Sequence, residues 1–125
     1  MSILNKLKSL ESARNKLVAE FMEIRSMLRG TFEINYRRCG KATCWCATSE
    51  KGHPCNRITG RKDTVGFTIS IRKEDVDWIK EVTQTYKRFR KLRQRLRELN
   101  EEERQLLNQL EDEIVEKTRK LKDYL

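Results

Sequence analysis

The sequence has one proline, one histidine and no long apolar run. A membrane-spanning helix needs about 20 apolar residues, and none is found; no apolar signal segment precedes the first charged residues either. We therefore expect a cytoplasmic protein, in a reducing compartment where cysteines bind metals more often than they form disulfides. No Ser/His/Asp set, glycine-rich phosphate loop or paired-carboxylate site is evident, so we do not expect an enzyme.

Charged residues make up 38% of the 125 residues and apolar residues 37%. This balance favours long helices with large exposed surfaces over a globule with a large core. The net charge of +9 is uneven, because residues 1–29, 30–63 and 64–97 carry +3, +4 and +6, whereas residues 98–125 carry −4. A polyanionic partner is expected for the basic part of the chain.

Two segments have the apolar spacing of amphipathic helices, residues 3–28 and 74–125, each with one charged interruption (Arg14 and Glu103). Gly30 is expected to end the first helix. Asn100 begins a sequence typical of a helix start, but neither glycine nor proline marks a turn there. A continuous second helix is therefore favoured over a break at this point.

Short strands are expected between the helices. Residues 31–36 alternate apolar and polar side chains, and residues 56–59 and 64–71 resemble a hairpin with a four-residue turn at 60–63. The predicted fold is mainly α, a long antiparallel coiled-coil hairpin with a small zinc-stapled β-ribbon between its helices. The predicted divisions are an N-terminal helix, a zinc ribbon and a basic-then-acidic helix, at residues 1–30, 31–72 and 73–125.

All four cysteines and the histidine lie within seventeen consecutive positions. Zinc is typically bound in proteins by four Cys or His side chains, and such a site would stabilise a short polar loop that helices cannot bury. The predicted Zn2+ ligands are Cys39, Cys44 and Cys46, with either His53 or Cys55 as the fourth. Two other interpretations are thiols buried as small apolar groups and a redox switch, in which neighbouring cations lower thiol pKa values.

The segment from Tyr36 to Ala47, followed by His53 and Pro54, resembles a family of short bacterial and archaeal proteins without an established activity. Their pattern is Cys-Gly-Lys-x-x-Cys-x-Cys, then His-Gly-Pro-Tyr, then a basic hairpin and a long charged helix. The resemblance covers residues 35–99 and implies that Cys39, Cys44, Cys46 and His53 are the characteristic residues. It also implies a link to mobile genetic elements. This chain departs from the pattern after the histidine, where Pro54-Cys55 replaces Gly-Pro-Tyr.

A stripe of cations runs along residues 86–97, where seven of twelve residues are basic and none is acidic. Together with the cations near the cysteines, these residues are predicted to contact a DNA or RNA backbone. The predicted contacts are Arg37, Arg38, Lys41, Arg57, Arg61, Lys62, Lys87, Arg88, Arg90, Lys91, Arg93, Arg95 and Arg97. An alternative interpretation pairs the stripe with the acidic tail of a second copy.

The predicted function is that of a zinc-binding, coiled-coil accessory or regulatory protein that binds nucleic acid, from a mobile element or phage. We expect a homodimer formed through the helices and no membrane partner. The alternative is an adaptor or inhibitor that binds a protein through its helices and zinc ribbon, without nucleic acid.

Overall fold

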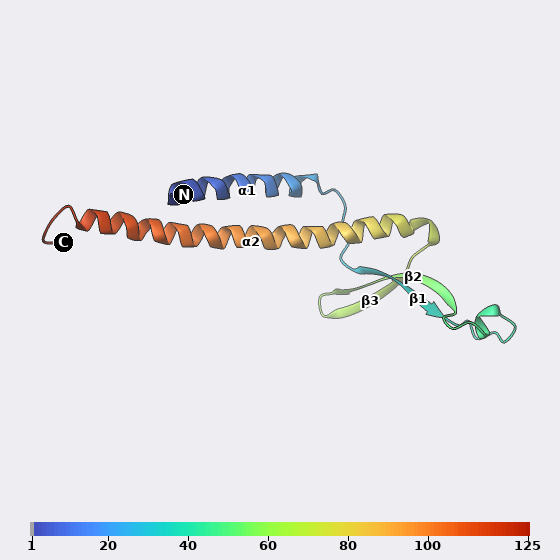
Figure 1. The fold of residues 1–125 in the computed structure, drawn as a ribbon. Coiled ribbons are helices and arrows are strands. Elements are labelled where there is room, and N and C mark those ends of the chain that lie inside the picture. The colour runs from blue at the N-terminus through green and yellow to red at the C-terminus, as the bar shows by residue number, and fades with distance from the viewer. Residues whose placement is uncertain (1) are drawn as a thin grey trace. The chain divides into compact units, whose positions relative to one another are not determined.

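The structure, a computed structural model, describes residues 2–125. Helix α1 is followed by three strands and then by the long helix α2, with 3-10 turns before β2 and before α2 (Figure 1). The bounds are α1 Ile3–Glu23, β1 Thr31–Arg37, η1 Trp45–Ala47, β2 His53–Lys62, β3 Val65–Ser70, η2 Lys73–Asp75 and α2 Val76–Arg119. The chain divides into two compact units: unit 1 is the chain up to Ile24 and from Phe89 onward, and unit 2 is Arg25–Arg88.

The prediction of a mainly-α hairpin with an inserted ribbon is wrong. The structure is 57% helical and 19% strand, and its strands form a three-stranded antiparallel sheet of order β1-β2-β3. This arrangement is α+β. The prediction failed because it treated the strands as a metal-dependent insertion, whereas β2 has ten residues, of which 53–59 pair with β1 and 57–62 pair with β3.

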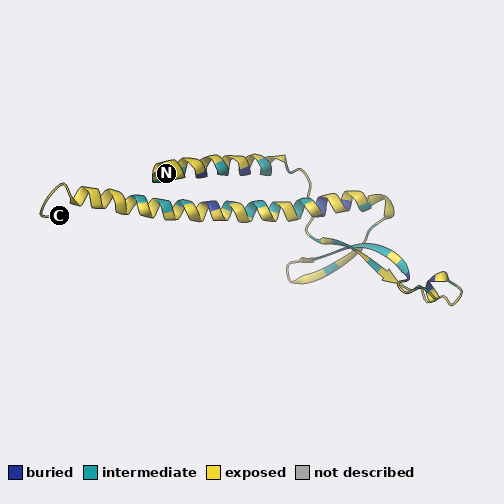
Figure 2. Cartoon of the chain, in the orientation of Figure 1, coloured by how far each residue is buried: buried dark blue, intermediate teal, exposed yellow. Residues whose placement is uncertain are grey.

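In unit 1, α1 packs antiparallel against α2 through a small apolar core of Leu10, Leu17 and Leu99. In Figure 2 the buried positions of α1 lie on the side toward α2. Near the C-terminal end of α1, the rings of Phe21 and Phe89 meet edge to face, with their centroids 5.2 Å apart. The Ser2 hydroxyl caps α1 by accepting a hydrogen bond from the Asn5 N–H, as an N-cap serine does.

The two charged interruptions of the apolar patterns are partners. An Arg14 Nη2 lies 2.9 Å from the Glu103 carboxylate and also donates to the Asn100 side-chain oxygen at 2.8 Å. The two side chains are about one third exposed, so this ion pair adds little stability, about 0–1 kcal/mol. The prediction that α2 continues through Asn100 is confirmed, and the helix ends at Arg119 rather than at the last residue.

Helix α1 is shorter than predicted, because the chain becomes extended at Ile24. The backbone N–H of Leu28 then donates to the carbonyl of Val82 in α2 at 3.1 Å. Gly30 is not the helix stop. It has φ +142°, and a Cβ there would lie 2.9 Å from the Ile58 side chain. Glycine is needed at this position because the linker passes closely over β2.

The hairpin is confirmed, but its turn is at residues 63–64 rather than 60–63. Gly60 lies within β2, opposite Phe67, where a Cβ would be 2.8 Å from the phenyl ring. This glycine makes room for an aromatic ring, and the sequence pattern had suggested a turn instead. Asp63 carries the positive φ of the actual turn.

The two faces of the sheet differ in character, because side chains alternate along each strand. One face carries apolar residues such as Phe32 and the buried Ile58, and Lys80 of α2 places its ammonium 5.3 Å from the Phe32 ring. The other face is polar and includes the cross-strand pair Glu33 and Arg57. Among residues 2–125, neither helix has the length and apolarity needed to cross a membrane.

Candidate metal centre

The cysteine-rich segment is a loop of residues 38–52 that joins the end of β1 to the start of β2. Arg37, the last residue of β1, pairs with His53, the first residue of β2. The sheet therefore fixes the histidine, while the loop brings the cysteines back to it. The position of the histidine follows from the strand register and could not be predicted from the spacing of the cysteines.

Cys39, Cys44, Cys46 and His53 come together, with one candidate ligand atom from each lying within 4.8 Å of all the others. The Cys39 and Cys46 sulfurs are 3.4 Å apart, and the Cys44 sulfur is 3.2 Å from His53 Nε2. Two sulfurs bound to one tetrahedral zinc at about 2.3 Å would lie about 3.8 Å apart, whereas a disulfide requires about 2.05 Å. The four side chains are thus arranged to bind a metal ion.

Hydrogen bonds within the loop hold it in this conformation. The N–H of Cys39 donates to the Cys46 sulfur at 3.4 Å, and the N–H of Cys44 donates to the Lys41 carbonyl at 3.1 Å. Arg38 closes the base of the loop by donating to the Ser49 carbonyl at 2.8 Å. Cys46 is the one fully buried member of the group.

Gly52 completes the return to β2. Its φ is +87°, and a Cβ at this position would lie 2.6 Å from the Arg37 carbonyl oxygen. Its N–H donates to the Ser49 hydroxyl at 3.2 Å. Sequence reasoning missed Ser49 and Gly52 as supports of the site, and only the glycine carried a signal, as a residue that tolerates positive φ next to a ligand.

The thiols differ in acidity. The hydrogen bond from the Lys41 backbone, with smaller contributions from Cys46 and His53, lowers the pKa of Cys39 to about 6. The hydrogen bond from the Cys39 backbone lowers the pKa of Cys46, but burial and the neighbouring Cys39 and Cys44 thiols outweigh it, so the net shift is upward. The Cys39 thiol therefore readily forms the thiolate that binds a cation. The buried Cys46 thiol would release its proton when a metal ion binds.

Of the two candidates for the fourth ligand, the structure places His53 with the three cysteines. Cys55 does not belong to the group; it lies two residues further along β2, paired with Asn35 of β1, with its sulfur 4.0 Å from the Asn56 carbonyl. Because β2 begins at the histidine, each further residue leads away from the loop. The Pro54-Cys55 sequence that follows the histidine thus leaves the group of four residues intact.

Within unit 2, the predicted backbone-contacting cations do not lie at one place. Arg37, Arg38 and Lys41 lie at the loop end of the sheet, and Arg61 and Lys62 lie at the opposite end, beside the β2–β3 turn. The length of β2 puts these ends about 30 Å apart at about 3.4 Å per residue. The remaining predicted cations, from Lys87 to Arg97, lie on α2 and are divided between the two units.

Several of these cations already have partners. Arg57 binds the Glu33 carboxylate across the strands, and Arg95 lies 3.3 Å from Glu98. The guanidinium of Arg93 is 5.6 Å from the centre of the Phe89 ring. Among the described residues, no carboxylate lies within ion-pair distance of Arg37, Lys41, Arg61, Lys62, Lys87, Arg90, Lys91 and Arg97. These eight are the cations best suited to an external anion.

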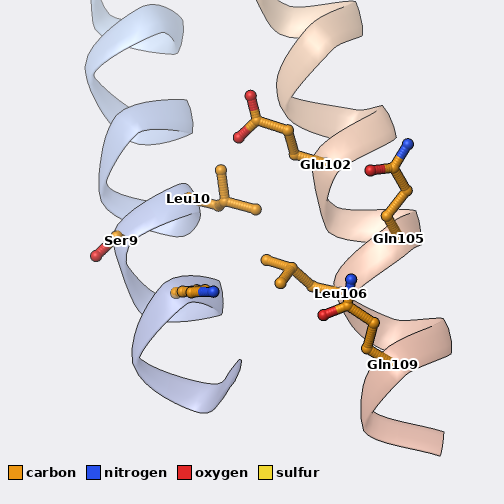
Figure 3. Close-up of a pocket in the computed structure, with 7 residues that line it drawn as sticks. Ser9, Leu10, Glu102, Gln105, Leu106 and Gln109 are labelled. Carbon is orange, nitrogen blue, oxygen red and sulfur yellow. The ribbon is translucent and has the colours of Figure 1, made fainter. Parts of the chain in front are cut away.

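A separate cleft of about 360 Å³ lies in unit 1, between the start of α1 and α2. Leu10 and Leu106 point toward each other across it, and Glu102 and Gln105 are on its rim (Figure 3). It is lined by Lys6, Ser9, Leu10, Glu102, Gln105, Leu106 and Gln109, without cysteine or histidine. It therefore has no part in the metal centre.

Comparison with known proteins gives one positive result. Neither the curated proteins nor the solved structures match this chain. A family model described as a domain of unknown function, DUF6788, matches residues 7–81, a span that contains the sheet and all four grouped metal-ligand candidates. The chain therefore belongs to the DUF6788 family.

Proposed function

We propose that the four grouped side chains bind one zinc ion and that the metal-stabilised unit 2 binds the backbone of a nucleic acid. Three thiolates and one imidazole form a ligand set that zinc favours, and in tetrahedral geometry they fill every coordination position. A closed site of this kind leaves no position for water or substrate. The ion therefore has a structural role, and the binding surface lies around it.

The observation that supports nucleic acid as the partner is the charge of unit 2. Residues 25–88 contain fourteen Lys and Arg against seven Asp and Glu, so they carry +7 of the net charge of +9. The unpaired cations lie at both ends of the sheet, as described above. A small phosphate compound cannot reach both ends, whereas an extended polyanion can.

A binding titration over a range of salt concentrations tests this function. If about four of these cations contact phosphates, the log–log slope of affinity against salt should be about −3 to −4. The double variant Arg37→Ala/Lys41→Ala should make this slope shallower by the contribution of about two phosphate contacts. The control Arg104→Ala/Lys117→Ala removes the same charge from cations that already have carboxylate partners, and it should leave the slope unchanged. Affinity that is indifferent to salt would exclude the function.

A second candidate activity, self-association through α2, is supported by the charge distribution of that helix. Residues 76–97 contain eight Lys and Arg against two Asp and Glu, whereas residues 98–119 contain three against eight. An antiparallel pair of these helices from two copies places opposite charges together. The acidic half also exposes apolar side chains, among them Leu107, Ile114 and Val115.

We expect Ile114→Asp to shift the chain from dimer to monomer, because it places a charge on the apolar strip that a second copy would cover. Sedimentation equilibrium measures this shift. Gln109→Glu adds the same charge at an exposed position that helical geometry places about 120° or more around α2 from both Ile114 and Val115, and it should leave the dimer intact. A wild-type chain that remains monomeric at every concentration reached would contradict self-association.

A further inference from the structure

Trp45 is exposed and yet firmly held. It lies between the ligand residues Cys44 and Cys46, begins the 3-10 turn, and accepts hydrogen bonds at its carbonyl from the Thr48 N–H and hydroxyl. Its ring meets the His53 ring edge to face, with the centroids 4.7 Å apart. Nevertheless the side chain remains 60% exposed. A rigid aromatic ring that the fold does not bury is available to an external partner.

The residues around this ring indicate the chemistry of that partner. Within the loop of residues 38–52 there are three cations, Arg38, Lys41 and Lys51, and a single carboxylate, Glu50. The apolar residues nearest in sequence to Trp45, apart from the ligand cysteines, are alanines. An apolar protein surface could contact only this one ring, because no large apolar side chain lies next to it in the sequence. An anion that carries flat apolar rings could stack on the indole and bind the neighbouring cations.

We propose that Trp45 stacks on an unpaired base of a single-stranded nucleic acid, while the cations of the loop contact the flanking phosphates. This inference rests on the proposed function and specifies the form of nucleic acid. In a duplex the base faces are stacked on one another and cannot reach an indole ring, whereas bases in a single strand can. Tyr36, the exposed residue before Arg37 in β1, has the Lys51 ammonium 5.2 Å from its ring centre and offers a second aromatic–cation pair near the loop.

The chain provides a matched control. Trp78 is the only other tryptophan and is 55% exposed, nearly as much as Trp45. It lies in the first turn of α2, where its sequence neighbours Glu74, Asp75 and Asp77 are acidic. A polyanion is repelled by these carboxylates, so exposure alone should not make Trp78 a stacking site.

The test uses zinc-loaded full-length protein and two single-tryptophan variants. Trp78→Phe leaves Trp45 as the only fluorophore, and Trp45→Phe leaves Trp78. Titration with oligothymidylate should quench the fluorescence of the first variant and not of the second, and a duplex of equal length should quench neither. Trp45→Ala should weaken single-strand binding about 5- to 100-fold, the range supplied by one stacked base. Trp78→Ala should bind as the wild type does.

The outcomes separate this inference from the function on which it rests. Absence of binding to any nucleic acid at low salt would remove both. Salt-dependent binding that prefers the duplex, or that Trp45→Ala leaves unchanged, would overturn the stacking inference only. If Trp45→Ala loses its metal, Trp45→Phe decides the question, because it keeps an aromatic ring beside His53 and should keep both the metal and most of the affinity. Trp45→Phe protein that holds zinc but binds no better than Trp45→Ala would also overturn it.

Discussion

Replacing Cys46 with serine is expected to abolish stoichiometric metal binding and to unfold the loop of residues 38–52. Cys46 is fully buried, and its sulfur is in contact with Cys39. Structural zinc contributes about 10–16 kcal/mol of apparent binding free energy in small zinc-dependent domains, so losing one of four ligands removes a large part of what orders the loop. Elemental analysis gives the metal-to-protein ratio, and hydrogen exchange reports on the loop.

Cys55→Ser is the matched control for this experiment. It makes the same chemical change two residues beyond His53, at a half-buried thiol outside the ligand group. It should retain one metal ion per chain and the protection of the loop against exchange. Equal loss of metal from the two variants would mean that Cys55 is a ligand and that the present assignment of His53 is wrong.

Leu99→Ala is expected to lower the free energy of unfolding of unit 1 by about 2–5 kcal/mol. Leu99 is 1% exposed and is the residue of α2 that completes the core with Leu10 and Leu17. Truncation leaves a cavity between the two helices, in the cluster against which Leu92, Leu96 and Leu106 also pack. Urea denaturation followed by far-ultraviolet circular dichroism measures the loss of the helices.

Leu107→Ala makes the same truncation on the same helix, at a side chain that is 48% exposed. It should change the free energy of unfolding by less than about 1 kcal/mol. Neither variant should change the metal content, because the ligand group lies entirely in unit 2. If the two truncations destabilise the protein equally, the packing described for α1 and α2 is not the packing in solution.

The positions of most elements could be predicted from the sequence, because they depend on local periodicity. The continuity of α2 through Asn100 followed from the absence of glycine and proline. The errors arose at residues whose identity is required by a contact with a distant part of the chain rather than by the local structure. Gly30 and Gly60 suggested a helix end and a turn, but both are required by close approach to another strand or ring. Such close approaches depend on strand pairing and cannot be predicted from the sequence alone.

The candidate site shows the same limit. Clustering in sequence was enough to predict that three cysteines lie together, because they belong to one short loop. Choosing between His53 and Cys55 required knowledge of where β2 begins. The cations were harder still, since residues near one another in sequence, such as Arg57 and Arg61, differ in having an acidic partner. Charge counting predicts the sign of a surface but not the location of its free cations.

The metal-to-protein ratio of wild-type protein purified without chelator tests the central claim most directly. Native mass spectrometry measures it together with the identity of the ion. The account predicts one zinc ion per chain, absent from Cys46→Ser protein and present in Cys55→Ser protein. Wild-type protein that is folded without stoichiometric metal, with the loop of residues 38–52 protected from hydrogen exchange, would contradict it.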